Sequence, residues 1–298
     1  MSNLEEERRA AQALHSGNYE EAFKLLRPLA EASSPYALMS LGWLHETGSV
    51  GEPDAQAARL NYESAIVQGS VLAYFYLGRL LLREGDDEEG RLALQAGAKL
   101  GDEQCVVELA RLSDIDAEER AAKALKDGAF EEAEKILKPL AERNSEYALL
   151  SLGWVYETGV LGVPDLETAR SYYESAVAQG SSSACFELGR MSRGQGKEAE
   201  ARSAFAKGAE RGDVPSMSRL GRMMVEGKGG PADAREGAVW LERAAAEGHI
   251  LAQRTLLGIE EKSASSLLEK LAVKRKIVSL MKRGAQEFLK DAQSDKVR

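Results

Sequence analysis

Hydrophobic residues in this chain recur every three or four positions, in short blocks separated by polar or glycine-containing turns. This spacing predicts α-helices, and no alternating pattern typical of strands is present. In the first part of the chain the pattern predicts seven helices, over residues 3–16, 18–32, 35–46, 54–68, 70–83, 86–100 and 102–112. The expected fold class is therefore all-α.

The helical pattern occurs twice along the chain. Residues 8–102 and 119–213 align without a gap at an offset of 111, and about half of the aligned residues are identical. A shorter unit, which starts from a Leu-Gly pair such as Leu41-Gly42, recurs inside each copy. Repetition at a fixed period is typical of stacked helical hairpins, because one hairpin cannot bury its apolar face alone. We therefore expect a right-handed superhelical solenoid.

Local signals mark where these helices begin and end. Asp54, Asp165 and Asp233 each precede a second helix and are predicted to be N-caps, and Asp233 with Glu236 fits a capping box. Glycines are predicted to end helices in the left-handed conformation. They are Gly48, Gly69, Gly159, Gly180, Gly227 and Gly248.

Several segments resemble a known family. LGWLHETG, LGWVYETG and LGRMMVEGKGGPADAREGAVWLERAAAEGHILAQ resemble the Sel-one-like repeat (SLR), an α-hairpin related to the tetratricopeptide repeat. HSGNYEEAFKLLRPLAE and KDGAFEEAEKILKPLAE resemble tetratricopeptide hairpins, and the resemblance covers roughly residues 8–258. It implies a non-catalytic scaffold or adaptor that holds a protein or peptide partner in its concave groove, in a bacterial envelope, polysaccharide or signalling assembly.

The predicted organisation has three parts. Residues 1–112 form the first copy, residues 113–258 the second copy with a third long unit, and residues 259–298 a C-terminal cap or tail. An odd number of helices in the first copy would place equivalent residues of the two copies on opposite faces. We therefore expect either an adjustment of the chain near residues 112–117 or a discontinuous groove there. The joint is placed in the segment LSDIDAEE, with Asp116 as an N-cap. Pro28 and Pro139 recur at one point of each copy, which suggests a bend in the helix.

The sequence contains no recognisable catalytic or metal-binding motif. His15, His45 and His249 are scattered, so no metal-ligand spacing is present, and the glycine-rich segment at residues 228–230 lacks the Lys-Ser or Lys-Thr of a phosphate-binding loop. Cys105 and Cys185 are expected to be buried free thiols. The polar N-terminus has no signal-peptide pattern, which favours the cytoplasm. We expect no enzyme activity, no cofactor and no metal.

The resemblance also points to groove residues. In hairpin repeats of this type, the residue two positions after the Leu of the Leu-Gly pair points into the groove. The candidates are Trp43, Arg79, Arg111, Trp154, Arg190 and Arg222, joined by Glu46 and Glu157 from the neighbouring turn and by Met39, Phe75, Leu150 and Phe186 from the preceding one. Trp and Arg are typical binding anchors. Alternatively, the tryptophans pack between hairpins and the arginines pair with local acids. Trp240 is expected to be structural.

The C-terminal segment differs in charge from the rest. Residues 259–298 carry a net charge of +4 in a chain of net charge −9, and the acidic body argues against nucleic acid as a ligand. An apolar stripe is predicted at Leu267, Leu268, Leu271, Val278, Met281, Ala285 and Phe288, with Lys270, Lys274, Lys276, Lys282 and Arg283 largely away from it. A capping helix is expected, because the last hairpin needs a cover. The alternative is a regulatory subunit that docks on an enzyme or a membrane surface through this basic helix. The oligomeric state is not indicated.

Overall fold

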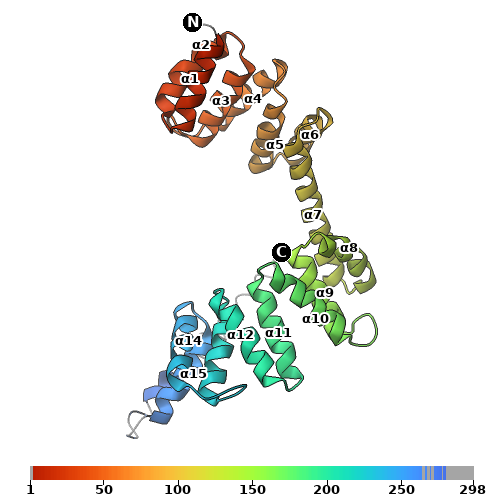
Figure 1. Ribbon diagram of the computed structural model, residues 1–298, viewed down its shortest axis with the longest axis vertical. Helices are drawn as coiled ribbons and strands as arrows, with labels where there is room; N and C mark the ends of the chain where they lie inside the picture. The colour runs from red at the N-terminus through yellow and green to blue at the C-terminus, as the bar shows by residue number, and fades with distance from the viewer. Residues whose placement is uncertain (1–2, 264–265, 267–268, 270–271, 277, 280–298) are drawn as a thin grey trace. The chain divides into compact units, whose positions relative to one another are not determined.

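The computed structural model describes residues 3–263, 266, 269, 272–276 and 278–279. Within these residues there is no strand, and the chain forms consecutive α-helices (Figure 1). They are α1 (Asn3–His15), α2 (Tyr19–Glu31), α3 (Pro35–Thr47), α4 (Ala55–Val67), α5 (Leu72–Glu84), α6 (Asp87–Lys99), α7 (Glu103–Lys126), α8 (Phe130–Glu142), α9 (Glu146–Thr158), α10 (Leu166–Ala178), α11 (Ser182–Gly194), α12 (Glu198–Glu210), α13 (Val214–Glu226), α14 (Ala234–Ala246) and α15 (Ile250–Ser263). The all-α prediction is confirmed. No helix in this described part has the length and apolar character needed to cross a membrane.

The chain divides into two compact units, Met1–Asp116 and Ala117–Arg298. In each unit, consecutive helices pack as hairpins, and each hairpin packs on the next (Figure 1). The residues between them are short turns, except where a longer loop follows α3, α9 and α13. These longer loops belong to the long repeat units that the sequence pattern indicates.

The predicted caps are confirmed. Asp54 Oδ1 accepts a hydrogen bond from the backbone N–H of Ala57 at 2.9 Å, and Asp165 Oδ1 accepts one from Thr168 at 3.0 Å. Asp233 caps α14 in the same way. At the other end of a helix, Gly48 adopts φ of 66°, a conformation that favours glycine because it has no Cβ. Aspartate and glycine thus set the helix bounds locally.

Helix α7 corrects the sequence analysis. It runs without a break from Glu103 to Lys126, so Asp116 is not an N-cap. Asp116 lies 111 positions before Gly227, the residue that ends α13 with φ of 69°. Aspartate adopts the left-handed conformation far less readily than glycine, and its carboxylate lies 2.8 Å from Arg91. The helix therefore continues where α13 stops.

The unbroken helix also changes the number of helices in one copy from the predicted odd number to an even number. The last helix of the first copy and the first helix of the second copy are the two halves of α7. One period therefore contains six helices, and α9 repeats α3 just as α11 repeats α5. Equivalent residues of the two copies therefore lie on helices of the same parity.

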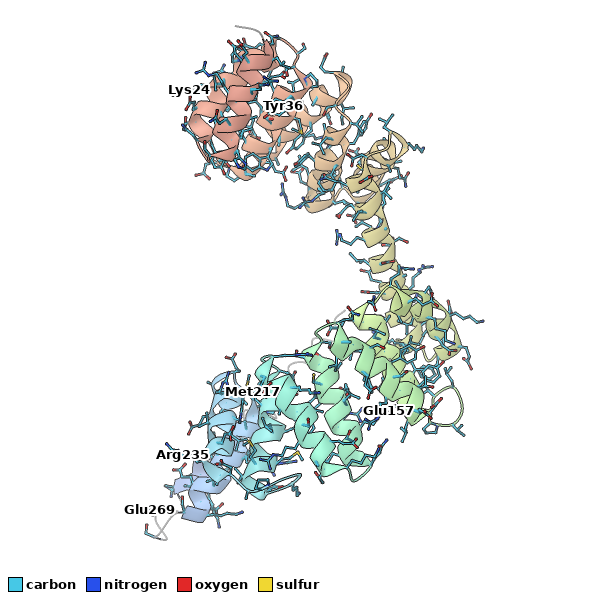
Figure 2. All side chains as sticks on the ribbon, in the orientation of Figure 1. Lys24, Tyr36, Glu157, Met217, Arg235 and Glu269 are labelled. Carbon is cyan, nitrogen blue, oxygen red and sulfur yellow. The ribbon has the colours of Figure 1, made fainter. Side chains whose placement is uncertain are left out.

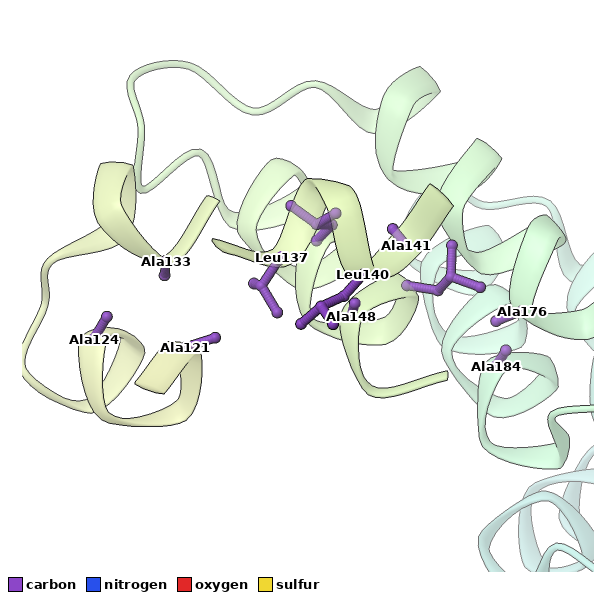
Figure 3. Close-up of a cluster of buried hydrophobic side chains, with 11 residues drawn as sticks. Ala121, Ala124, Ala133, Leu137, Leu140, Ala141, Ala148, Ala176 and Ala184 are labelled. Atoms are coloured by element: carbon purple, nitrogen blue, oxygen red, sulfur yellow. The ribbon is translucent and has the colours of Figure 1, made fainter. Parts of the chain in front are cut away.

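Small side chains let the helices pack closely. In the second unit, one core cluster joins alanines of α7 to leucines of α8 and to alanines of α9, α10 and α11 (Figure 3). Its labelled members include Ala121, Leu137 and Leu140, all fully buried. Burial of such apolar surface is the main stabilising contribution to folding. Cys105 and Cys185 are buried and free, as expected.

Only part of the C-terminal segment lies within the described residues. Val273 is buried, and Lys276 Nζ lies 2.9 Å from Glu260 of α15. Lys274 lies 3.8 Å from Glu261 of the same helix. These contacts agree with a segment that packs on the last hairpin. Of the predicted stripe, Leu267, Leu268, Leu271, Met281, Ala285 and Phe288 lie outside the described residues, as do Lys270, Lys282 and Arg283.

Candidate interaction surface on the odd-numbered helices

The candidate residues all lie on odd-numbered helices. Glu46 and Trp43 belong to α3, Glu157 and Trp154 to the equivalent α9. The arginines are distributed one to a helix: Arg79 on α5, Arg111 on α7, Arg190 on α11 and Arg222 on α13. The sequence pattern therefore selects one side of each hairpin, the side formed by its first helix.

Trp43 lines a pocket in the first unit. The pocket has a volume of about 360 Å³ and is bounded by three odd-numbered helices, α1, α3 and α5. Its lining residues are Ala11, Leu14, His15, Tyr36, Met39, Ser40, Trp43 and Tyr76. The Trp43 ring is half-buried and contacts Tyr19 edge-on, with the ring centroids 5.7 Å apart. Most of this lining is aromatic or apolar, which suits an apolar side chain of a ligand.

Trp154 is the equivalent residue in the second unit and is more accessible. Its side chain is 41% exposed, and its ring centroid lies 6.1 Å from that of Phe130. Trp240 differs from both, because it packs against a core cluster and carries the Arg243 guanidinium 4.6 Å above its ring. These positions agree with a structural role for Trp240, whereas Trp154 is partly exposed to solvent.

The two candidate glutamates are held by the chain itself. Glu46 accepts a hydrogen bond from the phenol of Tyr62 at 2.6 Å and another from Arg83 at 2.9 Å. The Tyr62 ring is fully buried and packs against Gly42. Burial, followed by the contact with Glu46, raises the pKa of the Tyr62 phenol. Glu46 thereby joins α3 to α4 and α5.

The second copy repeats this cluster with one change. Glu157, labelled in Figure 2, accepts a hydrogen bond from the phenol of Tyr173 at 3.1 Å. Its arginine partner is Arg190, at 2.5 Å, which also binds Glu187 at 2.7 Å. Arg83 and Arg190 are not equivalent, because Arg190 aligns with Arg79. The arginine that binds Glu157 on α11 therefore lies one helical turn earlier than the arginine that binds Glu46 on α5.

The remaining arginines have different surroundings. Arg111 binds Glu108 at 2.6 Å and lowers the pKa of that carboxyl. Arg79 lies over the ring of Phe75, 5.4 Å from its centroid, and is exposed. Arg222 contacts Glu226 at 3.9 Å, the longest contact of the set. The structure thus pairs Arg111 and Arg190 with local acids, while Arg79 and Arg222 keep most of their hydrogen-bonding capacity.

Among the residues that the structure describes, no three histidine, cysteine, aspartate or glutamate side chains cluster in a way that could hold a metal ion. His249 lies partly buried near Arg219, and burial followed by this arginine lowers the pKa of its imidazole. His45 contacts the ring of Phe23 instead. His249 accepts a hydrogen bond from the backbone N–H of Ala252, at 3.3 Å.

Comparison with protein families matches the Sel1 repeat five times, at residues 14–34, 35–70, 146–181, 182–213 and 214–249, more than half of the chain. The chain belongs to the Sel1 repeat family. Proteins of this family are generally protein–protein interaction scaffolds. The long repeats at 35–70, 146–181 and 214–249 carry Trp43, Trp154 and Arg222, respectively.

Solved structures of Sel1 repeat proteins are similar to this one. One is c5321, a protective antigen present in uropathogenic Escherichia coli strains that displays an SLR fold, with 25% sequence identity and a TM-score of 0.58 over 86% of this chain. This chain spans 56% of the length of c5321. A Sel1 repeat protein from Oxalobacter formigenes has 23% identity and a TM-score of 0.59, over 84% of this chain and 87% of its own. No curated protein is significantly similar in sequence.

Sequence reasoning missed some lining residues of the Trp43 pocket. Tyr36 lies two helical turns before Trp43 on the same face of α3, and the spacing of seven residues could have indicated it. Its position is labelled in Figure 2. Tyr76 comes from the next hairpin, and only the packing of α5 beside α3 brings it to the pocket. No local signal indicates that contact.

Proposed function

We propose that this Sel1 repeat protein is a non-catalytic scaffold or adaptor that binds a protein or peptide partner along its odd-numbered helices. The family supports an interaction role in general. The equivalent tryptophans on α3 and α9 give each unit a rigid aromatic contact on this side. Large aromatic side chains of this kind often contribute most of the affinity at an interface.

The pocket at Trp43 gives this proposal its strongest structural support. It has room for an apolar side chain, and its wall combines Trp43, Tyr36 and Tyr76 with the flexible Met39. Because the rings come from neighbouring hairpins, the pocket exists only when those hairpins are stacked. A partner side chain inserted there would bury apolar surface on both sides.

The polar candidates then divide into two groups. Glu46, Glu157 and Arg190 hold neighbouring helices together and would act by positioning the surface. Arg79 and Arg222 are the arginines best placed for direct contact with a partner, since their guanidinium groups are the least engaged. Arg111 could exchange its bond to Glu108 for a carboxylate of the partner.

The alternative role, docking on an enzyme or a membrane through the basic C-terminal helix, has less support. Lys274 and Lys276 are exposed, but both already pair with carboxylates of α15. The two similar structures come from bacteria, which supports a bacterial setting. The cytoplasmic location stays a prediction.

The test is capture of partners by the intact chain and by Trp43→Ala and Trp154→Ala variants, with Trp240→Ala as the matched control. We expect the first two variants to keep most of their thermal stability and to lose about 2 kcal/mol or more of affinity for each captured partner. Trp240→Ala should lose stability instead, because its ring packs on the core.

Mass spectrometry would identify the captured proteins, and titration calorimetry would give their affinities. If Trp43→Ala and Trp154→Ala retain full affinity for every captured partner, the odd-numbered helices are not the binding side. If they unfold as readily as Trp240→Ala, the rings are packing residues.

A further inference from the structure

A second pocket lies between α13, in the last matched Sel1 repeat, and α15, the helix that follows that repeat. Its volume is about 130 Å³, and both helices that line it are odd-numbered. Three of its lining side chains are arginines, Arg219, Arg222 and Arg254. The others are Ser218, Leu251 and Thr255. We call this set of six residues the arginine pocket.

The arginine pocket concentrates positive charge in an acidic protein. The chain has a net charge of −9, yet Arg219 and Arg222 lie close enough to repel each other, and Arg193 of α11 adds a further positive charge. Burial first, and then these two arginines, lower the pKa of the Arg219 guanidinium. Like charges gathered in a partly buried place destabilise the empty site.

Compensating acids are scarce around these arginines. Among the described residues, Arg193, Arg219 and Arg254 have no ion pair with a carboxylate, and Arg222 reaches Glu226 only at 3.9 Å. Glu226 also binds Lys228, at 2.9 Å, so its charge is shared. On α11, by contrast, Arg190 alone binds two carboxylates. The arginine pocket therefore has a surplus of positive charge that an anion would neutralise.

We propose that the arginine pocket binds the side-chain carboxylates of an acidic segment in a protein partner. The proposal rests on the proposed function, because it names the chemistry of the partner that the odd-numbered helices bind. The guanidinium group offers a planar fork of N–H donors that matches a carboxylate in two parallel hydrogen bonds. The pocket has room for one or two such groups.

A peptide fits the surroundings better than a nucleic acid or a free phosphate ion. Leu251, 49% exposed, stands beside the arginines and offers an apolar contact that a phosphate ion could not use. A nucleic acid would also meet the negative charge of the chain as a whole, which opposes binding of a long polyanion. A short acidic segment with an adjacent apolar residue uses both kinds of contact.

The experiment uses the full chain, immobilised, and two pools of short synthetic peptides. The pools are random in sequence except for a central pair, which is Glu-Glu in one pool and Gln-Gln in the other. We expect the chain to retain the Glu-Glu pool at least about tenfold better, and raising the salt concentration should reduce the difference. Sequencing of the retained peptides should show apolar residues beside the acidic pair.

The variants R222Q and R254Q should each reduce retention of the Glu-Glu pool by about tenfold, while leaving the Gln-Gln pool unchanged. The matched control is R235Q, which removes the same charge from the first turn of α14, an even-numbered helix (Figure 2). It should bind as the unaltered chain does. Circular dichroism checks that each variant keeps its helices.

Equal retention of the two pools, or an equal effect of R235Q and R254Q, would overturn the proposal. So would tighter binding of inorganic phosphate or of single-stranded RNA to the same arginines, because the occupant would then not be a peptide. The proposed function would survive these results if Trp43→Ala and Trp154→Ala still weakened partner capture. Conversely, if Trp43→Ala and Trp154→Ala did not weaken partner capture, the proposed function would fail, but the two peptide pools could still be retained differently.

Discussion

The ring of Tyr62 occupies the place where a side chain on Gly42 would begin. A Cβ added to Gly42 would lie 2.6 Å from two ring carbons of Tyr62, closer than real side chains approach. Gly42 sits inside α3 and Tyr62 inside α4, so the missing side chain sets how closely the two helices pack. Gly153 and Tyr173 repeat the relationship in the second copy.

Gly42→Ala should therefore destabilise the protein, although alanine favours helix more than glycine. The added methyl group must displace a buried ring, and overpacking of this kind typically costs about 1–3 kcal/mol. Gly194→Ala is the matched control, since Gly194 lies in α11 with open space around the added carbon. It should stabilise by up to about 1 kcal/mol. Urea unfolding of both variants measures the difference, and equal stability of the two would contradict the packing argument.

The buried phenols predict a loss of stability at alkaline pH. Burial raises the pKa of Tyr62 and Tyr173 in the folded state above the unfolded value of about 10. Because the unfolded chain releases these protons more easily, their contribution is complete below about pH 10 and is lost as the pH rises further. Unfolding free energies measured across this range should fall less steeply for the double variant Tyr62→Phe and Tyr173→Phe. Identical slopes for the double variant and the unaltered chain would contradict the prediction.

Helix α7 should resist proteases where the sequence alone suggested a joint. Limited proteolysis of the unaltered chain is expected to cut first in the loops after α3 and α9, not in the segment of residues 112–117. Asp116→Gly should make this segment sensitive, since glycine costs the helix about 1 kcal/mol and permits a left-handed end. Asp116→Ala loses the same pairing with Arg91 but should keep the helix intact. Early cleavage of the alanine variant at this segment would mean that the ion pair between Asp116 and Arg91, and not helix propensity, keeps α7 continuous.

The two thiols should be unreactive in the folded protein. Burial, with the neighbouring Asp102, raises the pKa of Cys105 to about 12, and burial also raises the pKa of Cys185. The reactive thiolate is therefore scarce near pH 8. Ellman's reagent should detect no thiol until denaturant is added, when both should react. Gln95→Cys, on the exposed face of α6, is the positive control and should react at once. Rapid reaction of the unaltered protein would show that one of the sites opens.

The helices and their caps could be predicted because their signals are local. The aspartate of a cap binds a backbone N–H only three residues away, as Asp54 does with Ala57. Helix α7 could not be predicted in the same way, because Asp116 is compatible with an N-cap and with a helix interior. Only comparison with Gly227, the glycine at the equivalent position, explains the continuation.

The candidate surface was predictable only in outline. The repeat register identified Trp43 and Met39, which the structure brings to one pocket. It could not show that Glu46 is held by Tyr62 and Arg83, since these partners lie 16 and 37 residues further along the chain. Whether a charged side chain already forms an ion pair within the protein depends on residues that are distant in sequence.

The junction between the two copies lies inside a helix rather than in a loop. A tandem duplication that joins two modules within α7 needs no newly evolved turn, only helix-forming residues in frame. Each added module contributes an even number of helices, so the exposed tryptophan or arginine of every later copy would stay on the same kind of helix. A gene encoding such a protein could lengthen by whole modules, and an engineer could do the same by splicing at α7.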